Sequence, residues 1–131
     1  MAGFSDFLEN AVLDHVFGGT AYTAPSTLYV GLYTAAPSDS GGGTEVSGGS
    51  YARKSMAAMT VSGTSPTNST NGAAVEFVTA TGSWGTVTHC GVFDAVSSGN
   101  LLGWAALTAS KTVASGDVFR FDSSDLTITL A

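Results

Sequence analysis

Apolar side chains recur at helical spacing near the start of the chain and at strand spacing through most of the rest. In residues 4–17 they lie three and four positions apart, which predicts one amphipathic helix. Ser5 or Gly3 can cap its start, and Gly18-Gly19 is a typical helix end. The apolar stripe of this helix contains Phe4, Phe7, Leu8, Ala11, Val12, His15 and Val16.

Short alternating segments separated by turn residues follow the helix. The segment at residues 84–94 has two apolar faces, with Val87 and Phe93 on one and Cys90 and Val92 on the other, which predicts a central strand. Together the segments predict a mainly β fold, an antiparallel β-sandwich of jelly-roll or Ig-like type, in a single domain over residues 1–131. The predicted strands cover residues 27–34, 51–61, 73–78, 84–94, 101–107, 118–121 and 126–130, and residues 62–72 are predicted to form a loop.

A polar loop separates the first two predicted strands. Between Pro37 and Tyr51 the chain contains little except Ser, Gly, Asp and Thr. Residues 43–50 have the spacing of a phosphate-binding loop, but Gly49 replaces the lysine that would reach the phosphates, and no helix follows. The pattern therefore favours a loop that contacts a neighbouring subunit or is simply solvated.

Charge is scarce in this chain and mostly negative. Charged residues make up 11% of the sequence, and the net charge is −6. The cations are Arg53, Lys54, Lys111 and Arg120, too few and too dispersed for a basic patch. This argues against direct binding of nucleic acid or of an anionic membrane. With neither a secretory signal nor an apolar run of membrane-spanning length, we expect the chain to fold in a cytoplasm.

The candidate chemical groups do not assemble into a known site. Cys90 is the only cysteine, and His89 beside it on a strand would point to the opposite face. Asp39 and Glu45 lie in a flexible loop, with nothing to fix the separation of their carboxylates. Trp84 and Trp104 could form a sugar-stacking platform, but core packing is the favoured interpretation on strands this apolar. We therefore expect no catalytic residue, no cofactor and no metal.

Several long phrases resemble a known family. They are LENAVLDHVFGGTAYTAP, LYVGLYTAAPSDSGGGTEVSGGSYAR, WGTVTHCGVFDAVSSGNLLGWAALTASKTVASGDVFRF and DLTITL. The chain resembles small virion proteins of tailed bacteriophages, commonly labelled "phage tail fibre protein". The resemblance covers nearly the whole chain apart from about residues 56–71. It implies a structural protein of the virion, assembled in the cytoplasm of the bacterial host, and it supplies no catalytic residues.

Two hypotheses for this virion protein differ in location. Small size and the absence of repeats favour a multi-copy capsid decoration or cement protein, which would form a trimer and contact the major capsid protein. The alternative is a tail fibre or baseplate-associated protein, with carbohydrate on the host surface as a candidate contact. In either case we expect the helix face and the polar loop to contact other proteins. The predicted interface contains Phe4, Phe7, Leu8, Ala11, Val12, His15, Val16, Pro37, Asp39, Gly42 and Glu45.

Overall fold

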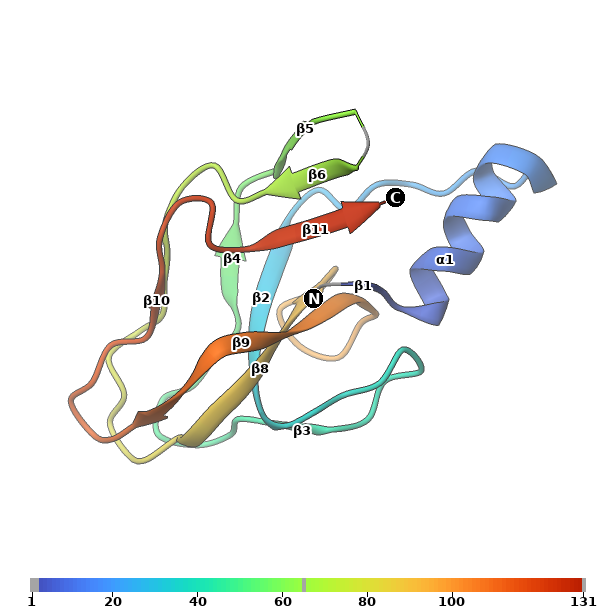
Figure 1. The fold of residues 1–131 in the computed structure, drawn as a ribbon. Coiled ribbons are helices and arrows are strands. Elements are labelled where there is room, and N and C mark those ends of the chain that lie inside the picture. Colours follow the sequence, from blue (N-terminus) through green and yellow to red (C-terminus); the bar gives the residue numbers. More distant parts are fainter. Residues whose placement is uncertain (1–2, 65, 131) are drawn as a thin grey trace.

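An antiparallel sheet forms the larger layer of the protein in the computed structural model, which describes residues 3–64 and 66–130. Its strand order is β1-β9-β8-β2-β3, and β4 also pairs with β2 (Figure 1). The long hairpin of β8 and β9 is central to it, as the sequence predicts. The bounds are Gly3–Phe4 for β1, Leu28–Ala35 for β2, Thr44–Glu45 for β3, Lys54–Met56 for β4, Gly85–Phe93 for β8 and Leu101–Val113 for β9.

Two smaller antiparallel sheets form the opposite layer. One pairs β10 with β7, and the other has the order β11-β6-β5. Their strands are β5 (Thr60–Ser62), β6 (Thr67–Thr70), β7 (Val75–Glu76), β10 (Arg120–Phe121) and β11 (Thr127–Leu130). Side chains from both layers meet in one hydrophobic core, among them Val30, Leu32 and Val92 from the main sheet and Phe119 and Phe121 from the other layer. The predicted mainly β, antiparallel fold with an N-terminal helix is confirmed.

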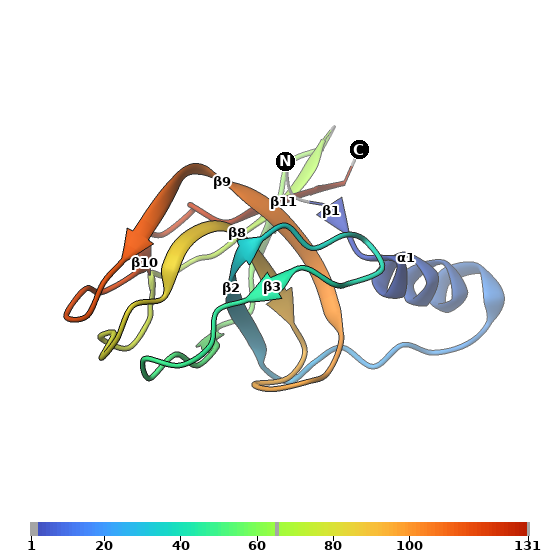
Figure 2. The ribbon, with the colours of Figure 1, turned by 90° about the horizontal axis from the view of Figure 1, so that it is seen from below.

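The N-terminal helix stands beside this β body (Figures 1 and 2). It consists of α1 (Asp6–Leu13) and a π-helical turn, η1 (Asp14–Gly18). The Ser5 hydroxyl caps the helix by accepting the Leu8 N–H at 3.3 Å, and the Ser5 N–H donates to the Leu102 carbonyl at 2.8 Å. Ser5 thereby joins the start of the helix to β9. The prediction is wrong at Phe4, which lies in β1 because the cap places it before the first turn.

Residues 51–72 depart most from the sequence-based expectation. The strand predicted at residues 51–61 is two strands, β4 and β5, which belong to different layers. The loop predicted at residues 62–72 contains β6, which lies between β5 and β11. The sequence of β6 is TNST, without an apolar residue, so it lacks the apolar alternation that identifies a strand in a sequence. Its two threonines nevertheless suit a β conformation.

An irregularity in β8 changes which side chains share a face. The pairing of β8 with β9 shifts register between Val87 and His89, as in a β-bulge. Val87 therefore joins Cys90 and Val92 in the core, whereas Phe93 packs on the other face of the sheet against Tyr33, at 6.2 Å between ring centroids. The prediction that Val87 and Phe93 share a face is wrong, because strict alternation does not survive a bulge.

Candidate protein interface

The polar loop between β2 and β4 is fixed by an ion pair between Arg53, at the end of the loop, and Glu45 in β3. Arg53 binds Glu45 through two hydrogen bonds, Nε to Oε2 at 2.9 Å and Nη2 to Oε1 at 2.8 Å. Only 10% of the Arg53 side chain and 25% of the Glu45 side chain are exposed. The Arg53 guanidinium carbon also lies 3.5 Å from the centre of the Phe93 ring. Glu45, predicted to contact a partner, thus contacts its own chain.

Arg53 reaches a second loop as well. Its Nη1 donates to the carbonyl oxygens of Ala95 at 3.0 Å and Ser98 at 2.8 Å. Burial lowers the pKa of Arg53, but the hydrogen bonds to Glu45 and the negative charge of Glu45 outweigh that effect. The pKa of Arg53 is therefore raised. One guanidinium therefore holds together the β2–β4 loop and the β8–β9 turn.

Tyr51 closes a gap along the edge of β2. β3 pairs with Tyr33 and Ala35 of β2, and β4 pairs with residues 28–30 of β2. The N–H of Leu32 therefore lies between the two paired stretches. The Tyr51 hydroxyl accepts this N–H at 2.9 Å and donates to Glu45 Oε2 at 2.7 Å. Burial, and then the bond to Glu45, raise the pKa of Tyr51 well above its usual value. The hydroxyl remains protonated and acts as a structural bridge.

Gly31 leaves the space that this cluster occupies. A Cβ at this position would lie 2.8 Å from Phe93 Cε1 and 2.9 Å from Glu45 Oε2. Those separations are too short for non-bonded atoms, so a side chain here would displace the ion pair or the aromatic ring. The glycine between the two tyrosines of β2 is therefore part of the loop anchor.

Asp39 ties the tip of the same loop to the helix. Its carbonyl oxygen accepts the Asp6 N–H at 2.9 Å, and its Oδ1 accepts the Trp104 indole N–H at 2.9 Å. Of the other predicted loop residues, Pro37 is buried and Gly42 is exposed. The structure thus brings the loop next to the first turn of the helix and leaves the far end of the helix apart from it (Figure 1).

The helix divides its apolar residues between two environments. Leu8, Ala11 and Val12 are half-buried, whereas Phe7 is 40% exposed and packs edge-to-face against Tyr22. His15 is exposed, and its Nδ1 accepts the Tyr22 N–H at 3.0 Å. The predicted stripe is therefore not one uniform surface.

The most exposed apolar group lies at the C-terminal end of the helix. The exposed fractions are 59% for Leu13, 61% for Val16 and 82% for Phe17. The sequence-based stripe included Val16 and missed Leu13 and Phe17. Their signal was available, because an apolar residue outside the main stripe of a helix indicates a second apolar surface.

The tryptophans do not form a platform. Trp84 is 3% exposed and donates its indole N–H to the Gly49 carbonyl at 2.9 Å, so its predicted core position is confirmed. Trp104 is half-buried and lies outside the core, near His89 on the outer face of the sheet. The core interpretation is wrong for Trp104, because its side chain shares a face with His89 and not with Cys90.

Candidate chemical groups stay apart in the part of the chain that the structure describes. No group of three or more His, Cys, Asp or Glu residues in residues 3–64 and 66–130 could hold a metal ion. Burial raises the pKa of the Cys90 thiol to about 11, which keeps it protonated at neutral pH. No helix of the described residues is long and apolar enough to cross a membrane.

A family of phage proteins matches almost the whole chain. Residues 3–129 match the sequence model described as "Podophage GP4 fiber I protein gp80". The chain belongs to this family. The predicted resemblance to phage tail fibre proteins is confirmed, and the match includes residues 56–71, where the resemblance had shown no pattern. The search of curated proteins found no match.

Membership in the fiber I family confirms a phage structural protein that is part of the virion. It favours the tail fibre alternative over the capsid decoration that the sequence analysis preferred. The capsid decoration hypothesis is not confirmed. It rested on small size and on the absence of repeats, and this chain has both features and still matches a fibre family. Other virion proteins follow as its partners.

Proposed function

We propose that this protein is a non-enzymatic component of a podophage tail fibre. The observation that carries the proposal is the match of residues 3–129 to a fiber I protein family. A tail location means that its partners are the tail proteins to which the fibre attaches and other copies of the chain, in place of the major capsid protein. Trimers remain part of the proposal, since fibre subunits act as assemblies.

The contacts within the polar loop support a structural role. Glu45 accepts hydrogen bonds from both Arg53 and Tyr51, and Arg53 also binds the β8–β9 turn, so the polar groups that are nearest to a catalytic arrangement in this loop already have partners. Carbohydrate binding through two stacked tryptophans is not favoured, because Trp84 is buried and Trp104 binds Asp39. The exposed helix end is the better candidate for a contact, and that contact is to protein.

Fractionation of virions tests the proposed location. Complete particles and tailless heads would be purified, and the copies of this protein per particle measured by quantitative mass spectrometry. We expect a few to a few dozen copies in complete particles and none in tailless heads. Hundreds of copies on tailless heads would instead establish a capsid decoration protein and overturn the tail location.

A further inference from the structure

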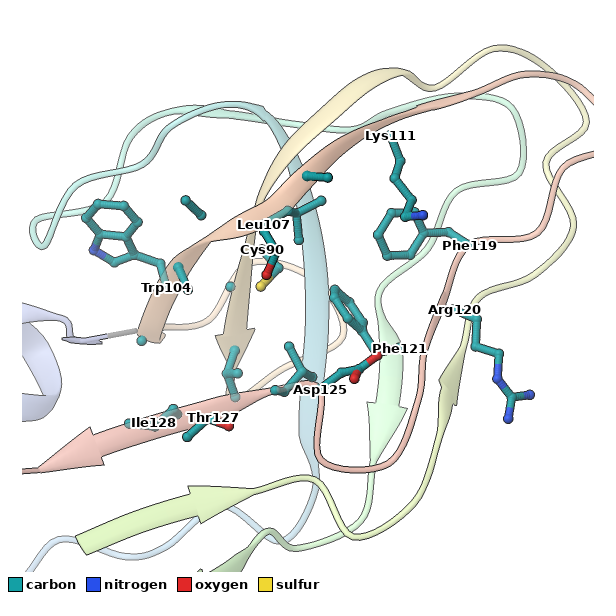
Figure 3. A pocket seen from close by; sticks show the side chains of 18 of the residues that line it. Cys90, Trp104, Leu107, Lys111, Phe119, Arg120, Phe121, Asp125, Thr127 and Ile128 are labelled. Carbon is teal, nitrogen blue, oxygen red and sulfur yellow. The ribbon is translucent and has the colours of Figure 1, made fainter. Parts of the chain in front are cut away.

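An open groove lies between the two layers, along β9 on one side and β10–β11 on the other (Figure 3). Its volume is about 490 Å³, within the range of about 300–1,000 Å³ that is usual for binding pockets. Its walls are largely apolar, and they include Leu107, Phe119, Phe121, Leu126 and Ile128. The edge of β9 beyond Trp104 pairs with no strand of the described residues, so the groove is open from that side.

Cations are concentrated at this groove, although the net charge of the chain is −6. Lys111 and Arg120, two of the four cations of the chain, line it. Arg120 is exposed and pairs with Glu76 and Asp122, while Lys111 takes part in no ion pair within residues 3–64 and 66–130. Asp125 also lines the groove, and its Oδ2 accepts the Asp122 N–H at 2.9 Å. Lys111, on the β9 side of the groove, is therefore the lining cation without an ion pair in the described residues, while Asp125 keeps its negative charge on the opposite side, ahead of β11 (Figure 3).

The C-terminal end of the helix is apolar and acidic, in contrast to the groove that Lys111 lines. Leu13, Val16 and Phe17 are exposed at spacing i, i+3 and i+4, which is the spacing of anchors on a helix that binds in a groove. Asp14 lies at this end, the same helix carries Asp6 and Glu9 in its first turn, and the first 52 residues of the chain contain no Lys or Arg. This end of the helix is therefore an apolar and acidic surface.

We propose that the helix end of one copy, residues 13–18, docks in the groove of a second copy. The apolar anchors would cover the groove walls, and the acidic residues of the helix would face Lys111. The two surfaces differ, so the contact is heterologous and joins copies head to tail, into a closed ring or an extended chain. This contact is a separate proposal from the tail location. It is tested with the isolated protein in solution, so the contact and the tail location can fail independently.

Two variants break opposite sides of the contact. The helix variant is Phe17→Glu, and the groove variant is Ala109→Glu with Lys111→Glu, where Ala109 is an exposed residue of the groove wall. All three positions are exposed, so the variants should keep the melting temperature of the wild type within a few degrees. Val78→Glu, an exposed apolar position outside the groove wall, is the matched control.

Sedimentation velocity of the full chain over a range of concentrations reads out assembly. We expect the wild type and the control to associate, and each variant alone to associate at least tenfold more weakly. An equal mixture of the helix variant and the groove variant should form dimers that do not grow further, because each supplies the surface that the other lacks. A monomeric wild type, a variant that assembles like the wild type, or a mixture that stays monomeric would each overturn the proposal. If either variant unfolds, Val16→Glu or Ala109→Glu alone replaces it.

Discussion

Two segments that the sequence indicates as contact surfaces differ in how the rest of the chain holds them. The polar loop, residues 36–53, is bound to the sheet, to the β8–β9 turn and to the helix through Arg53, Tyr51 and Asp39. The helix end, residues 13–18, has no buried residue. A glycine-rich sequence can therefore be a fixed part of the fold, while the π-helical end of a helix provides the exposed apolar surface.

The ion pair gives the largest expected difference between the two segments. Arg53→Ala should lower the free energy of unfolding by about 3 kcal/mol, because it leaves Glu45 and two carbonyl groups without their partner in a largely buried site. Urea denaturation followed by circular dichroism would measure the loss. Arg120→Ala is the matched control: its side chain is 52% exposed and its ion pairs are screened by solvent, so we expect a much smaller loss than at Arg53. Equal losses at the two arginines would contradict a fixed loop.

Removing the Tyr51 hydroxyl should have a smaller effect. Tyr51→Phe keeps the ring in the core and leaves the Leu32 N–H and Glu45 Oε2 without this partner, at a cost of about 1–3 kcal/mol. Tyr29→Phe on the same strand is the control, since the Tyr29 hydroxyl makes no hydrogen bond in the described residues. An unchanged denaturation midpoint for Tyr51→Phe would show that the hydroxyl is not a bridge.

Alkaline pH should destabilise the same region. Burial and the Glu45 charge raise the pKa of Tyr33 to about 12 from an ordinary value of 10.0, and the pKa of Tyr51 is raised further. A raised pKa means that the stabilisation is fully present below pH 10 and is lost as the pH rises through the folded-state value. We therefore expect the free energy of unfolding to fall between about pH 10 and pH 12. Tyr51→Phe should reduce this fall, and an equally steep fall in that variant would count against the assignment.

The helix end should contribute least to stability. Phe17→Ser removes a side chain that is 82% exposed, so the free energy of unfolding should change by less than about 0.5 kcal/mol. Phe77→Ser, at a position that is 2% exposed, is the control and should cost about 3–5 kcal/mol or prevent folding. A large loss at Phe17 would mean that the helix end packs on its own chain.

Local patterns predicted the elements and missed the contacts between them. The helix with its Ser5 cap, the strand β2 and the β8–β9 hairpin follow from the spacing of apolar residues and from turn residues. The split of residues 51–61 between layers and the bulge at Val87 depend on pairing with distant strands, which leaves no local signal. Arg53 binds Glu45, Ala95 and Ser98, which lie 8, 42 and 45 positions away from it along the chain. Only the folded chain therefore reveals this cluster.

Hydrogen exchange in the assembled virion tests most directly whether the helix end, and not the polar loop, is the surface that contacts other proteins. Amide protection would be compared between the isolated protein and the protein in purified particles, by mass spectrometry of its peptides. We predict that assembly raises protection at residues 13–19 and along the open edge of β9, and leaves residues 43–53 unchanged because their contacts already exist in the isolated protein. New protection confined to residues 43–53, with none at the helix end, would contradict this account.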